Sequence, residues 1–129
     1  MKVIKASTFN ATITIGLQKG YSNELYTKES FIEAIQSYQR KLITEKNLYL
    51  SACVLDCLIV LNNQLEPHLK IEFISYPKFP LEKGVFKSNV NSLGEFLMKK
   101  FEQNRIVIAY SDETLMFEIE DKIDYRINQ

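Results

Sequence analysis

The order in which two hydrophobic periodicities follow one another along the chain restricts its fold more than any other feature. Helical spacing occurs twice, from about residue 27 to 45 and from about 86 to 103. The extended patterns lie at 11–17, 49–61, 70–76 and 105–110. The resulting order, β-α-β-β-α-β, consists of two split βαβ units whose crossovers should be right-handed. It predicts an α+β ferredoxin-like plait, with one antiparallel sheet and two helices on one face.

The first strand and the first helix carry clear signals. Ile13, Ile15 and Leu17 alternate with threonines, which is typical of a half-buried strand. Thr27 can cap the following helix through its side-chain oxygen. The apolar stripe of that helix comprises Phe31, Ile35, Tyr38 and Leu42, and Ile32 and Ile43 widen it.

Residues 49–61 are almost uniformly apolar, so periodicity alone does not separate a buried strand from a buried helix. Their β-branched content and the Asn62-Asn63 pair behind them favour a strand in a hairpin. On a strand, Cys53 and Cys57 would share a face roughly 13 Å apart, too far for a disulfide or a shared metal. On a helix, the same spacing would bring them within reach of a metal. We interpret them as buried free thiols.

The second helix has an apolar stripe made of Val90, Leu93, Leu97 and Phe101. Gly94 interrupts it at a cost of about 1 kcal/mol relative to alanine, which is tolerable where the helix lies close to the sheet. We expect Asn104 to end this helix in a left-handed conformation.

Beyond that helix, residues 105–110 and 114–119 form a second predicted hairpin around Ser111-Asp112-Glu113. The alternation at 122–127 suggests an additional C-terminal edge strand.

Composition narrows the class of protein. A chain of 129 residues, 46% of them hydrophobic, can form a single domain over 1–129 with a substantial core. Its formal net charge of zero argues against a general binder of nucleic acid or anionic membranes. The longest apolar run, 58–61, is far too short to span a bilayer, and no secretory signal is evident. We therefore expect a cytoplasmic protein with no membrane and no nucleic-acid partner.

The sheet face away from the helices allows a prediction about oligomeric state. A plait covers only one face, yet residues 49–61 are apolar on both. Either a second copy or the C-terminal strand has to cover the other face, and we favour a homodimer.

Candidate site residues are few. His68 is the only side chain with an ordinary pKa near neutrality, and Glu66 lies beside it at the predicted tip of the central hairpin. Asp56 stands within the apolar strand, where a buried carboxylate needs either structural partners or a ligand. Gln103 and Arg105, between the second helix and the fourth strand, could bind an anion. Ordinary structural roles explain each of these residues more simply.

Catalytic and cofactor motifs are not recognisable in the sequence. A single histidine does not build a typical zinc site, so no metal is expected. The stretch 16–20, with glycine at both ends, lacks the spacing of a phosphate-binding loop, so no cofactor is expected.

Three short strings resemble a family of small bacterial plait domains of unknown function: Ile13-Thr14-Ile15-Gly16-Leu17, then Glu66-Pro67 before a strand, then Phe101-Glu102-Gln103-Asn104-Arg105-Ile106. In that family a tryptophan often follows the second strand, and this chain has none. The resemblance implies the plait and no activity. It points to Gly16, Glu66 and Gln103 as residues of one shared pocket.

These observations lead to two hypotheses about function. The leading one is a non-enzymatic binding or assembly module that dimerises through its sheet, because an apolar face occurs without a catalytic constellation. The alternative is a small dimeric plait enzyme or metabolite sensor with a pocket near Glu66, His68 and Asp56.

Overall fold

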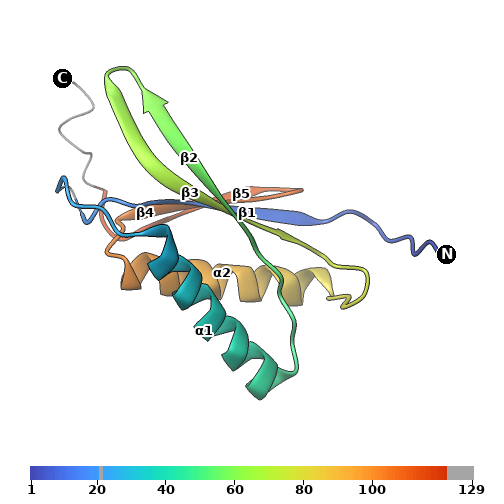
Figure 1. Cartoon of the computed structure of the whole chain (residues 1–129). Coiled ribbons are helices and arrows are strands. Elements are labelled where there is room, and N and C mark those ends of the chain that lie inside the picture. Colours follow the sequence, from blue (N-terminus) through green and yellow to red (C-terminus); the bar gives the residue numbers. More distant parts are fainter. Residues whose placement is uncertain (21, 122–129) are drawn as a thin grey trace.

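The computed structural model describes residues 1–20 and 22–121 and contains a five-stranded sheet with two helices. The elements are β1 (Asn10–Gly16), α1 (Lys28–Lys46), β2 (Cys53–Leu61), β3 (Gln64–Ile74), α2 (Lys83–Lys100), β4 (Arg105–Tyr110) and β5 (Thr114–Glu118). The strand order is β2-β3-β1-β4-β5 and every neighbouring pair is antiparallel. Both helices lie on one face (Figure 1). The predicted plait is confirmed, with β5 as its extra strand.

The central strand β1 shows the predicted alternation. Ile13 and Ile15 are fully buried beneath the helices, whereas Thr12 and Thr14 lie on the other face, hereafter the open face. Because β1 pairs with β3 on one side and β4 on the other, its backbone polar groups are used in both directions.

Helix α1 begins where the sequence indicates. The Thr27 side chain accepts a hydrogen bond from the Ser30 backbone N–H at 3.1 Å, which satisfies one of the free donors of the first turn. Phe31, Ile35 and Leu42 are buried in the common hydrophobic core. Ile43 is 40% exposed, so the expected widening of the apolar stripe is wrong at that position.

The β2–β3 hairpin differs from its predicted outline. Asn62 adopts the left-handed conformation (φ 54°), and the pairing of Leu61 with Gln64 leaves a two-residue turn. Strand β3 therefore begins six residues earlier than the predicted start at Lys70. Glu66 and His68 consequently lie within a strand, not at the hairpin tip. A tight turn allows cross-strand pairing to continue through Pro67, whose carbonyl accepts a hydrogen bond from Leu17 N–H.

The distal part of this hairpin extends past the helices (Figure 1). It carries exposed apolar side chains, because the helical layer ends before it. The most exposed of these are Leu58, Val60, Leu61 and Leu65.

Helix α2 has the predicted apolar stripe but different ends. It runs from Lys83 to Lys100, and Glu102, not Asn104, takes the left-handed conformation (φ 52°). Gln103 N–H then donates to Met98 C=O at 2.9 Å, which satisfies a carbonyl of the last helical turn. Neither described helix combines the length and the apolarity needed to cross a membrane.

The β4–β5 turn is tied to the start of α2 by charge. Lys83 and Lys87 both bind the Asp112 carboxylate, and Lys87 also binds Glu113. Hydrogen bonds from Lys83 and then Lys87 lower the pKa of Asp112 to about 2. The predicted hairpin at 105–119 is confirmed in substance, whereas the predicted strand at 122–127 lies outside the described residues.

Gly94 marks the closest approach of α2 to the sheet, as the sequence suggested. A Cβ there would lie 2.9 Å from Ile108 Cδ1 and 3.0 Å from Ile106 Cδ1. Gly84, in the first turn of the same helix, would meet only the Glu82 carboxylate oxygen at 3.5 Å.

These two glycines predict opposite outcomes for one substitution. Gly84→Ala should leave stability unchanged or raise it slightly, because alanine is about 1 kcal/mol better in a helix. Gly94→Ala should lower it, because overpacking a filled core costs about 1–3 kcal/mol and exceeds that gain. Urea denaturation of both variants measures the difference. Equal stabilities would contradict close packing at Gly94.

Candidate functional site

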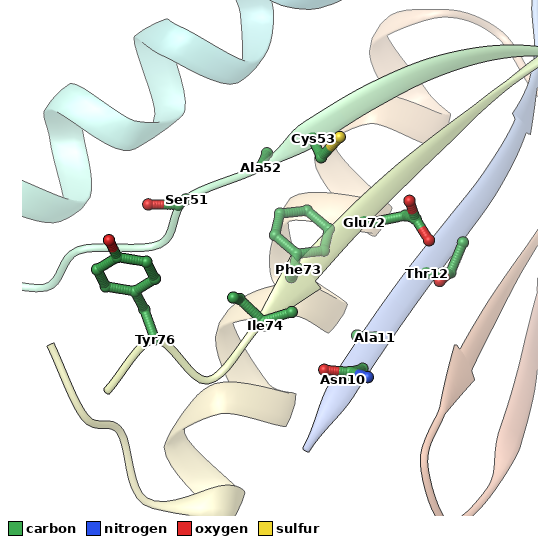
Figure 2. Close-up of a pocket in the computed structure, with 10 residues that line it drawn as sticks. All are labelled: Asn10, Ala11, Thr12, Ser51, Ala52, Cys53, Glu72, Phe73, Ile74 and Tyr76. Carbon is green, nitrogen blue, oxygen red and sulfur yellow. The ribbon is translucent and has the colours of Figure 1, made fainter. Parts of the chain in front are cut away.

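A pocket of about 360 Å³ opens where β2, β3 and β1 lie side by side, at the end of the sheet where β1 begins. Figure 2 shows the residues that line it. They are Asn10, Ala11, Thr12, Ser51, Ala52, Cys53, Glu72, Phe73, Ile74 and Tyr76. Its volume falls within the range of small-molecule sites, roughly 300–1,000 Å³.

Strand register places the central row of this pocket. Glu72 of β3 pairs with Thr12 of β1 on one side and with Cys53 of β2 on the other. Side chains of directly paired residues point to the same face of a sheet, so these three stand together on the open face. In Figure 2 the Glu72 side chain extends toward Thr12.

The polar side chains of the pocket are not used to hold the fold. Within residues 1–20 and 22–121, the side chains of Thr12, Ser51 and Glu72 take part in no hydrogen bond or ion pair. In folded proteins, polar groups that stabilise structure are normally paired. These hydroxyl and carboxylate groups are therefore available to a ligand.

Aromatic rings adjoin the pocket beside Tyr76. The Tyr76 ring stacks on Phe79 with centroids 5.9 Å apart, and Phe79 stacks on Tyr49 at 4.9 Å. All three are between 39% and 45% exposed. Half-exposed rings of this kind can accept a further flat group by stacking, so the pocket combines a polar row with an aromatic end.

A second cluster lies at the opposite end of β1, around Gly16. A Cβ at Gly16 would be 2.7 Å from Gln103 Oε1 and 3.5 Å from the His68 ring, so both side chains press against the glycine backbone. Gln103 Nε2 donates to the carbonyls of Gln18 (2.6 Å) and Phe101 (2.8 Å). It thereby fastens the loop after β1 to the end of α2.

The structure brings together some of the predicted site residues and separates others. His68 and Gln103 meet at Gly16, and Glu66 lies next to His68 on the same face, where its carbonyl contacts His68 Nδ1 at 3.2 Å. None of the five predicted residues lines the pocket described above. The other two, Arg105 and Asp56, form ion pairs elsewhere.

Arg105 of β4 pairs with Glu118 of β5 at 2.5 Å. The prediction that Asp56 is a buried carboxylate is wrong. Its side chain is 69% exposed, and it pairs with Lys28 at 3.0 Å on the helix side of the sheet. The reason is that β2 is an edge strand and Asp56 lies where α1 only begins.

The strand conformation of residues 53–61 decides the predictions about the two cysteines and about a metal site. Cys53 and Cys57 are free thiols on a strand, as expected, but Cys53 is exposed and Cys57 half-buried, so the prediction of buried thiols is wrong. Both face the open side, which neither of the two described helices covers (Figure 1). Among the residues that the structure describes, His, Cys, Asp and Glu side chains form no group suited to a metal ion.

One further ionisable pair lies near the Gly16 cluster. Tyr26 donates a hydrogen bond to Glu102 Oε2 at 2.6 Å, and this bond raises the pKa of Tyr26 to about 12. The Tyr26 ring packs against Phe31 and Phe101, so the pair lies at the edge of the hydrophobic core, near the start of α1 and the end of α2. Its role is structural.

The sequence patterns do not identify the residues that line the pocket. Thr12 is one of the threonines that alternate with isoleucines in the first predicted strand, and Glu72 lies in the predicted extended run at 70–76, but neither stands out as a site residue. The available signal was the alternation along each strand. Thr12 is next to the buried Ile13 and Glu72 is next to the buried Ile71, so both side chains point to the open face. The register that aligns them was not predicted.

Neither protein-family profiles nor curated protein sequences give a match. Among solved structures, a phage SAM lyase in complex with S-methyl-5'-thioadenosine is similar with a TM-score of 0.71 and 19% identity. The apo state of a phage SAM lyase gives 0.70 and 18%. Both similarities cover 95% of this chain and 98% of the other.

At this identity the similarity establishes the fold alone. It nevertheless contradicts our leading hypothesis of a non-enzymatic module, because both of these structures, which share the fold over 95% of this chain, are of an enzyme. The alternative hypothesis, a small enzyme or metabolite sensor, fits the comparison better.

The Gly16 cluster predicts coupled effects of two substitutions. Gln103→Ala should lower the free energy of unfolding by about 1–3 kcal/mol, because it leaves polar groups without partners. Gly16→Ala should also destabilise, but much less when Gln103 is already alanine, since the obstructing Oε1 is then gone. A double-mutant cycle by urea denaturation measures this coupling, and strictly additive effects would contradict the contact.

Proposed function

We propose that this chain is an enzyme that binds S-adenosylmethionine and cleaves it in a lyase reaction. The observation that carries the proposal is the similarity, over 95% of the chain, to a phage SAM lyase whose structure holds S-methyl-5'-thioadenosine. The pocket on the open face supports it, because its groups and size suit an adenosine-bearing ligand.

This reaction requires little chemical assistance from protein side chains. S-methyl-5'-thioadenosine keeps the methyl and adenosyl groups, so the bond that breaks joins the sulfonium sulfur to the γ-carbon of the methionine part. Both electrons of that bond stay on sulfur, which becomes a neutral thioether. A lyase adds no water, so the four-carbon fragment leaves as a ring: its own carboxylate oxygen bonds to the γ-carbon as the carbon–sulfur bond breaks, and no proton is transferred. The positive sulfur is already a good leaving group, and the protein contributes mainly by holding the substrate in a reactive conformation.

The pocket provides groups for each part of such a substrate. The Thr12 and Ser51 hydroxyls can hydrogen-bond the ribose or the base, and neither side chain has a partner within the described residues. The exposed ring of Tyr76 can stack on the purine. A carboxylate, Glu72, faces the remainder.

The proposal predicts a measurable product. Incubation of the purified chain with S-adenosylmethionine should release S-methyl-5'-thioadenosine, detected by liquid chromatography, and the product itself should raise the melting temperature. Ile74→Trp, which fills the pocket from an exposed position, should abolish both effects. Met116→Trp, on the same face but outside the pocket, should abolish neither.

Failure of the wild-type chain to bind or cleave S-adenosylmethionine would refute the proposal. Equal loss in Ile74→Trp and Met116→Trp would place the site elsewhere.

We also propose that the chain is a homodimer. The exposed apolar residues of the distal hairpin and the open face support this, since monomers rarely expose apolar patches larger than a few hundred Å². A cytoplasmic location and kinship with the small bacterial plait domains remain predictions.

Self-association can be tested directly. Light scattering after size exclusion should give twice the 15.0 kDa of one chain. Leu58→Glu combined with Leu65→Lys should shift the mass toward 15.0 kDa, because it places charge on the exposed apolar surface of the hairpin. A wild-type monomer would contradict the proposal.

A further inference from the structure

The pocket contains one formal charge. Of its ten lining residues Glu72 alone is ionisable to a charged form at neutral pH, and the others are apolar or neutral polar. The carboxylate stands in the central row, between Thr12 of β1 and Cys53 of β2 (Figure 2).

This charge is not compensated by the part of the chain that the structure describes. Glu72 takes part in no ion pair there, whereas other exposed carboxylates, such as Asp56 and Asp112, do. The next charged side chain on the same face is Lys70, two residues earlier in β3. Lys70 pairs in register with Thr14 and Leu55, one row away from the pocket, and does not line it.

A lone carboxylate in a mostly apolar pocket discriminates between ligands by charge. Its attraction for a cation increases as the ligand displaces water and the local dielectric constant falls. A neutral ligand of the same shape gains nothing from the carboxylate, and its binding removes some of the water that solvates it.

We propose that Glu72 is the specificity-determining residue of this pocket and that it selects cationic sulfonium ligands over neutral thioethers. The inference rests on the proposed function and deepens it. The cation that Glu72 attracts is the positive sulfur of S-adenosylmethionine, with the ammonium group of the same ligand as a second candidate. Glu72 recognises the charge and takes no part in bond cleavage.

This assignment has a consequence for turnover. Cleavage converts the sulfonium into a neutral thioether, so the nucleoside product loses the attraction that held the substrate. The same carboxylate that favours substrate binding then favours release of S-methyl-5'-thioadenosine. Binding is thus strongest before the reaction and weaker after it.

Binding measurements with three probes test the inference, and the affinity for S-adenosylmethionine is taken from the first phase after rapid mixing, before the proposed cleavage consumes it. The probes are S-adenosylmethionine, S-adenosylhomocysteine and S-methyl-5'-thioadenosine, of which the first alone carries a sulfonium. The homocysteine analogue keeps the ammonium and carboxylate groups, so it separates recognition of sulfur from recognition of the ammonium. Wild-type chain should bind S-adenosylmethionine about 3- to 10-fold more tightly than S-adenosylhomocysteine, as expected for a partly exposed charge pair. Added salt should reduce the ratio.

Two variants complete the experiment. Glu72→Gln keeps the shape of the side chain and should bring the ratio close to one, with the affinity for S-methyl-5'-thioadenosine retained. Glu33→Gln removes the same charge from an exposed position of α1, on the other side of the sheet, and should keep the wild-type ratio.

The outcomes separate this inference from the proposed function. If wild type binds the nucleosides without preferring the sulfonium, or if Glu72→Gln keeps the preference, the assignment to Glu72 is wrong while the function stands. If Glu33→Gln loses the preference equally, net charge and not Glu72 is responsible. If none of the three probes binds to wild type, the proposed function fails and the inference fails with it.

Discussion

The pairing of β1 with both β3 and β4 is the constraint on which the rest of this structure depends. It places a strand of alternating isoleucines and threonines at the centre of the sheet, so that one face is committed to the core and the other to solvent or a partner. Two close contacts that only glycine permits lie against this central strand and its neighbours. Gly94 lets α2 approach the isoleucine side chains of β1 and β4, and Gly16 lets Gln103 fasten the loop that follows the strand. The same pairing fixes which polar side chains share the open face.

Sequence patterns were sufficient for the fold because each element carries its own periodicity. These local signals include the Thr27 cap, the apolar stripe around Phe31 and the alternation in β1. They can be recognised without knowing which elements pack beside them. Failures occurred where a boundary depends on tertiary pairing. The start of β3 is set by a two-residue turn at Asn62 and by continued pairing through Pro67, which no pattern in residues 64–69 reveals.

The site was harder to predict for a related reason. The pocket gathers residues from three strands that are distant in sequence, and Thr12, Glu72 and Cys53 meet only through the register of two separate pairings. Nothing in their local surroundings distinguishes them from ordinary solvent-facing residues. For Asp56 the error was different: the sequence predicted a buried carboxylate, and the side chain is exposed. An apolar sequence context suggested burial, but β2 is an edge strand beside the beginning of α1, and there an apolar neighbourhood does not bury a side chain.

The prediction of a non-enzymatic module rested on the lack of a recognisable nucleophile, acid–base pair or metal site in the sequence. That step assumes that an enzyme must activate its substrate. A sulfonium ion carries its own activation, because cleavage neutralises the charge on sulfur and needs neither an external nucleophile nor a proton donor for the leaving group. For such a substrate the required features are a pocket of suitable size, an aromatic surface, polar groups for the nucleoside and a counter-charge. In the pocket of this chain, β1 and β3 contribute Thr12 and Glu72, and the segments next to β2 and β3 contribute Ser51 and Tyr76. Strand register, together with the segments that adjoin β2 and β3, is enough to bring such features together in a chain of this size.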